Sequence, residues 1–188
     1  MTASYDKPME HWRFRRIVIV GSGGSGKSWL ATRLAVITGF PLFHLDRCFL
    51  RPGWTMLPRD EREAQQEKMI SGDSWIIDGN WASSMAPRFA AADLVIFLDI
   101  NRLVCLWGVL CRAGKSRLDI PDDLAEPKAL SLANLRFYRR LLAYPKAERP
   151  AVLALHDANP DTTFMRLHSR REVEELLAGW TGIVGGRP

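Results

Sequence analysis

The sequence predicts a three-layer α/β fold, with helices on both faces of a parallel sheet of about five strands. Short apolar runs, of the kind expected for strands covered on both faces, alternate with longer segments that carry apolar residues at helical spacing. This alternation favours parallel strands joined by right-handed crossovers. A chain of 188 residues also suits one domain, and we expect a single domain over residues 1–188.

The first half of the chain predicts two strand–helix pairs. Residues 17–20 read Ile-Val-Ile-Val, a β-branched run typical of a buried strand, and glycines follow it directly. The helix predicted at 28–38 has leucine and isoleucine side chains at helical spacing and stops at a glycine. A short strand at 42–45 follows, and a proline opens the polar helix expected at 59–70.

The second half repeats this pattern. Strands predicted at 75–77 and 94–98 each run into an aspartate, and helical segments follow both. A loop rich in charge and proline is expected at 113–127. The remaining predicted elements are helices at 102–111, 130–143, 151–157 and 172–177 and a last strand at 162–167.

Composition excludes several classes of protein. With 47% hydrophobic and 25% charged residues, the chain is typical of a folded globular protein. Its 20 arginines and 6 lysines against 21 acidic residues favour contact with anions. The three cysteines have no paired close spacing, which argues against a disulfide framework or zinc site and favours the cytoplasm. The polar start and the charges within the longest apolar stretch predict neither a signal peptide nor a membrane span.

The turn after the first strand carries the strongest motif. Residues 21–28 match the pattern G-x-x-x-x-G-K-[ST] between a strand and a helix, the context that a phosphate-binding P-loop requires. Glycines let backbone N–H groups turn toward phosphate oxygens, and the start of the helix adds partial positive charge. The predicted nucleotide-binding residues are Gly21, Ser22, Gly23, Gly24, Ser25, Gly26, Lys27 and Ser28.

Lys27 and Ser28 decide which ligand this turn binds. Lys27 would place a cation on the β- and γ-phosphates, and the Ser28 hydroxyl would ligate Mg²⁺, so ATP with Mg²⁺ is the predicted cofactor pair. An overlapping G-x-G-x-x-G pattern is typical of dinucleotide-binding folds. We discount that interpretation because it gives Lys27 and Ser28 no role.

Three aspartates, Asp46, Asp78 and Asp99, each end a predicted strand. The carboxyl ends of parallel strands line the ligand crevice, so all three are expected near the phosphates. A Mg²⁺ ion held by Ser28 needs a nearby carboxylate, for which Asp78 is the first choice and Asp99 the second. Asp46 has two equal interpretations: an acceptor or general base for the hydroxyl that receives the phosphoryl group, or the N-cap of a short helix.

Arginines that follow the strands could stabilise a transferred phosphoryl group. We interpret residues 112–127 as a small mobile lid that carries Arg112 and Arg117. These two arginines are the predicted catalytic cations beside Lys27, and a solvated basic loop is the competing interpretation. Arg88 could instead hold an anionic group of the acceptor.

Aromatic and histidine side chains are assigned by their neighbours. Trp54 and Trp81 lie on loops that leave the strand ends and could wall an acceptor pocket or stack on a base. The predicted acceptor-binding residues are Asp46, Trp54, Asn80 and Arg88. The tryptophans expected in the core are Trp29, Trp75 and Trp107. His44 and His156 have no paired ligand spacing, so we expect histidines of the core or surface.

Four further motifs lie in order along the chain. They are His-Leu-Asp at 44–46, Pro-Gly-Trp at 52–54, Trp-Ile-Ile-Asp-Gly-Asn-Trp at 75–81 and Leu-His-Ser-Arg-Arg-Glu-Val at 167–173. With the P-loop, they resemble the adenylate-kinase-like P-loop proteins of the DNA topology modulation group over nearly the whole chain. The resemblance implies a core like that of nucleoside monophosphate kinases, with sheet order 2-3-1-4-5. In that order the strand that ends in Asp78 lies beside the first strand, which favours Asp78 as the partner of Mg²⁺.

The predicted function is that of an ATP-dependent phosphotransferase, which moves the γ-phosphoryl group of Mg-ATP to a small acceptor. The sequence does not identify that acceptor or the oligomeric state. The alternative is a nucleotide-dependent DNA-binding or topology-modulating ATPase, as the name of the group implies. Against it, the basic residues are spread along the chain and no DNA-binding module is visible. A nucleotide-binding regulator with little turnover is a third hypothesis.

Overall fold

The centre of the molecule is a sheet of five parallel strands. The computed structural model describes residues 13–51, 55–112, 120 and 132–185. The strands are β1 Arg16–Gly21, β2 Leu42–His44, β5 Trp75–Asp78, β6 Leu94–Leu98 and β7 Thr163–Leu167. They lie in the order β2-β5-β1-β6-β7. Counted in chain order within this sheet, that is 2-3-1-4-5, so the predicted fold class and strand order are confirmed.

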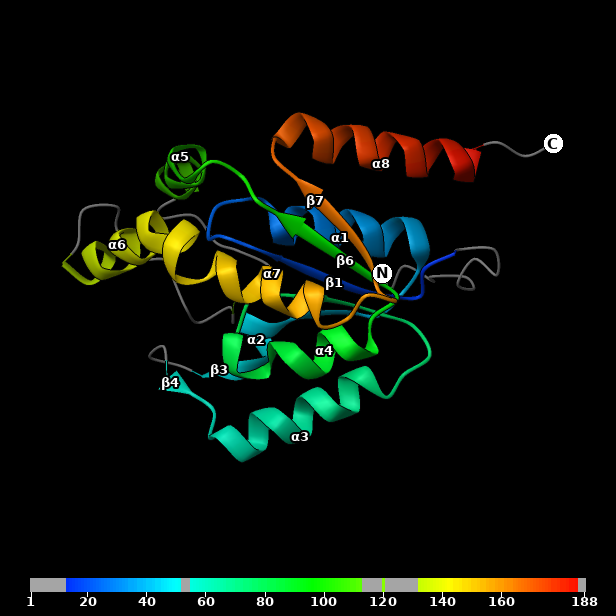
Figure 1. Cartoon of the computed structure of the whole chain (residues 1–188), viewed down its shortest axis with the longest axis horizontal. Helices are drawn as coiled ribbons and strands as arrows, with labels where there is room; N and C mark the ends of the chain where they lie inside the picture. Colours follow the sequence, from blue (N-terminus) through cyan, green and yellow to red (C-terminus); the bar gives the residue numbers. More distant parts are fainter. Residues whose placement is uncertain (1–12, 52–54, 113–119, 121–131, 186–188) are drawn as a thin grey trace, which may run out of the picture.

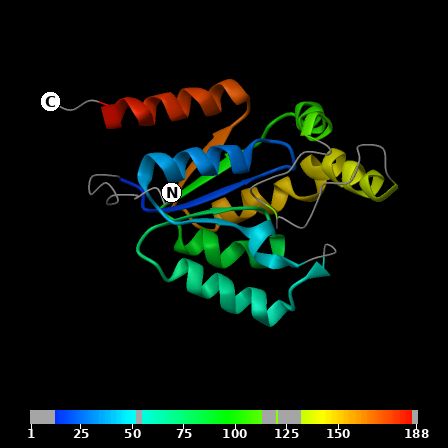
Figure 2. The ribbon, with the colours of Figure 1, turned by 180° about the vertical axis from the view of Figure 1, so that it is seen from behind.

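Helices cover both faces of this sheet (Figure 1). The helices are α1 Lys27–Thr38, α2 Leu45–Phe49, α3 Arg59–Ile70, α4 Met85–Ala91, α5 Arg102–Arg112, α6 Leu132–Ala147, α7 Arg149–Asp157 and α8 Arg170–Gly185, with a 3-10 turn at Ala82–Ser84. α1 and α8 lie on one face and α3, α4 and α7 on the other, as Figure 2 shows from behind. α5 and α6 pack against each other beyond the sheet, on the side where the strands end. Among the described residues, no helix is long and apolar enough to cross a membrane.

β1 separates two halves of the apolar core. Ile17 and Ile19 pack with side chains of α1 and α8, whereas Val18 and Val20 pack on the opposite face, and all four are fully buried. Because both faces are covered, every one of these positions is apolar. The strand ends at Gly21, which is in register with Leu98 of β6. The buried strand thus delivers the glycine-rich turn to the carboxyl edge of the sheet.

A small antiparallel ribbon lies outside the main sheet, and the sequence does not predict it. β3 Leu50–Arg51 pairs with β4 Thr55–Met56. A strand of two residues is too short for an alternating pattern to show. The ribbon directly follows α2.

The structure corrects one interpretation of Asp46. This residue lies in the first turn of α2, and the N-cap of that helix is His44, so the interpretation of Asp46 as an N-cap is wrong.

Of the three tryptophans expected in the core, only Trp75 lies there. Trp75 is fully buried at the start of β5, but Trp29 is 41% exposed and Trp107 is 64% exposed. The Arg33 guanidinium lies over the Trp29 ring, 3.8 Å from its centroid. Apolar neighbours in sequence do not determine which face of a helix meets the sheet, and both residues lie on outward faces.

Candidate nucleotide-binding site

The P-loop has the backbone of a phosphate cradle. Gly24 and Gly26 have φ angles of 78° and 99°, in the left-handed region that favours glycine. α1 begins directly after Gly26, an N-cap without a side chain, so the partial positive charge of the helix start lies at this turn. The Lys27 Nζ donates to the carbonyl oxygen of Ser22 at 3.0 Å and so lies across the turn.

Helices α5 and α6 back the tip of the P-loop. A Cβ placed on Gly24 would clash with the carbonyl oxygen of Cys105 in α5. A Cβ on Gly23 would lie 3.0 Å from the Phe137 ring of α6. Two helices that come much later in the chain therefore pack against the turn, and the approach of α5 requires glycine at Gly24.

A pocket of about 1170 Å³ opens over this turn. Its lining includes residues 21–24 and 26–28 of the P-loop, together with the predicted site residues Asp46, Asp78, Asn80 and Arg112. Side chains from β2, α3, β5, α5 and α6 also contribute to its walls. One pocket therefore combines phosphate-binding groups with carboxylates and aromatic side chains, as a site for two substrates needs.

Asp78 lies at the end of β5, next to β1, and is almost fully buried. Its Oδ2 lies 2.9 Å from His44 Nδ1, at the end of the neighbouring strand β2. Its Oδ1 is buried and has no hydrogen-bond partner among the described residues. A carboxylate oxygen in this position is the kind of ligand that Mg²⁺ prefers, so the donor set fits the ion.

Asp46 and Trp81 both line the pocket and contact each other directly. The indole Nε1 of Trp81 donates to Asp46 Oδ1 at 2.8 Å. Trp81 has a φ of 38°, which places a bulky residue in the left-handed region. The Arg62 guanidinium of α3 lies 5.4 Å from the centroid of the Trp81 ring. The strained turn after β5 thus fixes a tryptophan that orients a carboxylate beside the phosphate cradle.

Arg88 lies away from the position that the sequence suggests for it. Its side chain is fully buried in α4, and it does not line the pocket within the described chain. Its guanidinium donates to the carbonyl oxygens of Gly79 at 2.9 Å, Asn80 at 2.6 Å and Ser84 at 3.2 Å. Burial lowers the pKa of Arg88 to about 9, against the opposing effect of Asp78, so it remains a cation at neutral pH. This geometry supports the loop after β5 and does not offer the guanidinium to an acceptor.

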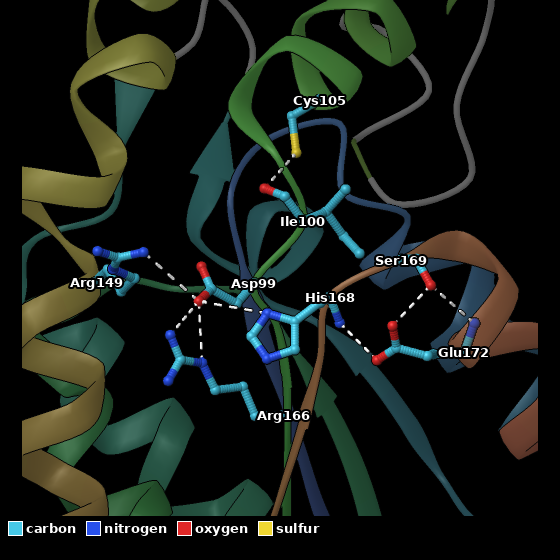
Figure 3. Close-up of polar contacts among 8 residues, drawn as sticks. All are labelled: Asp99, Ile100, Cys105, Arg149, Arg166, His168, Ser169 and Glu172. Atoms are coloured by element: carbon cyan, nitrogen blue, oxygen red, sulfur yellow. Dashed lines mark hydrogen bonds and ion pairs between the residues drawn. The ribbon is translucent and has the colours of Figure 1, made fainter.

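Asp99 also lies apart from the pocket, in a cluster of cations (Figure 3). Its Oδ2 accepts from Arg166 Nε at 3.0 Å, and Arg149 Nη1 lies 3.7 Å away. The Nδ1 of His168 is 4.0 Å from the same oxygen. Among the described residues it is Asp78, and not Asp99, that the structure brings to the P-loop pocket.

Two predicted positions, Trp54 and Arg117, lie outside the described residues, as does most of the lid expected at 112–127. Arg112 lies within them, at the end of α5, and lines the pocket.

The pocket also contains residues that the sequence does not single out. They include Arg62, Arg140, Tyr144 and Glu148, together with His44, which the sequence assigns to the core or surface. Burial and the nearby Glu148 raise the pKa of Tyr144, so its hydroxyl stays neutral. The position of His44 at a strand end is a signal that could have identified it. Arg62, Arg140 and Tyr144 lie on helices and Glu148 lies in the turn between α6 and α7, and no motif marks any of them.

Comparisons with known proteins identify the fold. No family model matches this chain, and no curated protein matches it. A shikimate kinase from Acinetobacter baumannii, solved in complex with shikimate, superimposes with a TM-score of 0.58 at 14% identity, over 92% of this chain and 93% of that one. A gluconokinase from Sinorhizobium meliloti 1021 superimposes with a TM-score of 0.49 at 18% identity, over 90% of this chain and 93% of that one. The group expected from the sequence motifs is not among these findings, and the chain has the α/β fold of the shikimate kinase, a P-loop kinase.

Proposed function

We propose that this chain is an ATP-dependent phosphotransferase that moves the γ-phosphoryl group of Mg-ATP to a small acceptor. The observation that carries the proposal is that the P-loop, Asp78 and Asp46 open onto one pocket. That arrangement suits in-line transfer, in which positioning and electrostatics supply most of the rate. The similarity in fold to a kinase solved with a small molecule supports an acceptor of that size.

The nucleotide half of the site uses the P-loop. The amides of the turn and of the start of α1 would bind the phosphates, and Lys27 would neutralise the transferred group. Ser28 and Asp78 would hold Mg²⁺, which would supply positive charge to neutralise the phosphates. The buried, unpartnered Asp78 Oδ1 is the feature of the described residues that best supports this assignment.

The acceptor half would lie around Asp46. Trp81 orients this carboxylate, which suits a partner with a hydroxyl group because a carboxylate accepts its hydrogen bond and can receive its proton. Arg62 and Arg112 line the same pocket and would oppose the negative charge that develops on the phosphoryl group. Asn80 is proposed to hold the backbone of the P-loop in place, through the hydrogen bond that its Oδ1 accepts from the Gly21 amide.

The test is acceptor-dependent release of ADP. Purified protein is incubated with Mg-ATP and a panel of nucleosides, nucleoside monophosphates and small hydroxylated metabolites. We expect one acceptor class to raise ADP formation at least about tenfold, and Lys27→Ala to abolish the increase because the cation on the phosphates is lost. Lys68→Ala, an exposed lysine of α3 away from the pocket, is the matched control. Salt-sensitive duplex binding with no stimulation by any acceptor would favour the DNA-binding ATPase instead.

Asp78→Asn tests the metal assignment within this proposal. Asparagine can keep the hydrogen bond to His44 but removes the charge, so we expect a fall of at least about tenfold in Mg²⁺-dependent turnover with the thermal midpoint nearly unchanged. Unchanged turnover at low Mg²⁺ would contradict the assignment of Asp78.

A further inference from the structure

A chain of side-chain hydrogen bonds joins the first residue of the P-loop to α6. The N–H of Gly21 donates to Asn80 Oδ1 at 2.9 Å. The Asn80 Nδ2 donates to Glu148 Oε2 at 3.1 Å, and Arg140 Nε donates to Glu148 Oε1 at 2.7 Å. All four residues line the pocket. The phosphate cradle is therefore tied to a carboxylate and a cation that come more than a hundred residues later in the chain.

The direction of this chain is fixed by its chemistry. Because a backbone N–H can only donate, Asn80 must present its carbonyl oxygen to Gly21 and its NH₂ group to the carboxylate. Turning the amide over would set two donors against each other at Gly21 and two acceptors at Glu148. In this orientation one Asn80 side chain satisfies both partners, and so links Glu148 to the P-loop.

Both the backbone and the side chain of Glu148 make hydrogen bonds. It lies directly before α7, and its amide donates to the carbonyl oxygen of Tyr144 at 3.0 Å. Its side chain is only 19% exposed, and each carboxylate oxygen accepts one of the hydrogen bonds above. Arg140 is 70% exposed, so Glu148 is the buried and more restrained partner of this ion pair.

Glu148 places a negative charge in the lining of a pocket that is proposed to bind a negatively charged ligand. A lone carboxylate that lines a pocket for a triphosphate would repel the ligand. Arg140 pairs with it, and Asn80 uses its second oxygen to hold the P-loop. The contribution of Glu148 must therefore come through the groups that it positions, since its own charge opposes binding.

We propose that Glu148 is a positioning residue for phosphoryl transfer. Through Asn80 it holds the first amide of the P-loop, and through its ion pair it holds Arg140 at the pocket. This inference rests on the proposed phosphotransferase function for its kinetic consequences. Its structural part, the restraint on Gly21, does not depend on turnover.

The kinetic test compares Glu148→Gln and Glu148→Ala. Glutamine keeps an acceptor for Asn80 but loses the charge that holds Arg140, and alanine loses both. We expect kcat to fall roughly threefold in the first and tenfold or more in the second, with KM for Mg-ATP unchanged or lower. If Glu148 acted only by repelling the negative phosphates, both variants would lower the KM for Mg-ATP and leave kcat unchanged. That result would overturn the proposal. Glu175→Gln is the control, because Arg171 Nε lies 2.7 Å from its Oε1 on α8, away from the pocket.

A second measurement needs no nucleotide. Hydrogen exchange of the Gly21 amide, followed by NMR in the free protein, should accelerate at least about tenfold in Glu148→Ala and in Asn80→Ala, and much less in Glu148→Gln. Unchanged exchange in Glu148→Ala, or in Asn80→Ala if Glu148→Ala does not fold, would overturn the inference. Wild-type protein with normal Gly21 protection but no acceptor-dependent turnover would instead contradict the proposed function alone.

Discussion

Gly24 combines two constraints at a single residue. Its φ of 78° is costly for any other residue, and a side chain there would meet the backbone of α5. We expect Gly24→Ala to lower the free energy of unfolding by about 1–3 kcal/mol and to weaken Mg-ATP binding, because the cradle must shift. Denaturant unfolding and calorimetry measure the two effects.

The matched control for this substitution is Gly179→Ala in α8. A Cβ at Gly179 meets nothing within 4 Å, and alanine favours a helix interior. We expect this variant to gain about 0.5–1 kcal/mol of stability. Equal effects of the two substitutions would show that neither the left-handed backbone nor the approach of α5 matters at Gly24.

Arg88 supports the same pocket by hydrogen bonds to the backbone of two of its lining residues, Gly79 and Asn80. Arg88→Met would leave the carbonyl oxygens of Gly79 and Asn80 without their donor in a buried place. We expect a loss of at least about 2 kcal/mol in the free energy of unfolding by urea. Arg88→Lys should recover little of it, because a single ammonium group cannot reproduce the planar fork of the guanidinium. Full recovery with lysine would show that only the charge is needed.

Among the elements, the starts of β1 and β6 are joined by Asp93. Its carboxylate accepts from the amides of Arg15 and Arg16 at 3.1 and 3.0 Å and from Arg16 Nη2 at 2.7 Å. Burial alone would raise the pKa of Asp93, but the hydrogen bonds from Arg16 and from the two amides outweigh it and lower the pKa below its ordinary value of 3.8. The carboxylate therefore stabilises the fold only while it is ionised.

This pairing predicts how stability depends on pH. Because the folded pKa is depressed, the contribution of Asp93 is fully present above about pH 4 and is lost as pH falls through the folded pKa. We expect Asp93→Asn to cost about 1 kcal/mol at pH 7 and progressively less below pH 4. Urea unfolding of both proteins between pH 2 and 7 measures this difference. A difference that stays constant down to pH 2 would contradict the assignment.

The elements also show what could be predicted from the sequence. β6 is apolar at every position and β1 is apolar over residues 17–20, so their burial and parallel pairing follow from the pattern alone. The P-loop is a local motif and was equally predictable. The outward faces of Trp29 and Trp107 were not, because the direction in which a helix packs depends on residues distant in sequence. Glu148 was unpredictable for the same reason, since its partner Asn80 lies 68 positions away.

Across the whole molecule, the two halves of the proposed site meet at the carboxyl edge of one sheet. β1 supplies the P-loop, β2 leads to Asp46, and β5 ends in Asp78 between them. α5 and α6 close this edge from beyond the sheet and back the P-loop at Gly23 and Gly24. A ligand that binds the P-loop therefore contacts groups from most parts of the chain, and its binding should stabilise the entire fold.

Isothermal titration calorimetry with Mg-ATP tests the central claim most directly, which is that residues 21–28 bind a triphosphate. For the wild-type protein, we predict saturable heat with one site per chain. Lys27→Ala should weaken this binding by at least about tenfold while Lys68→Ala leaves it unchanged. No detectable heat from folded wild-type protein at millimolar Mg-ATP, or equal affinity in Lys27→Ala, would contradict the account.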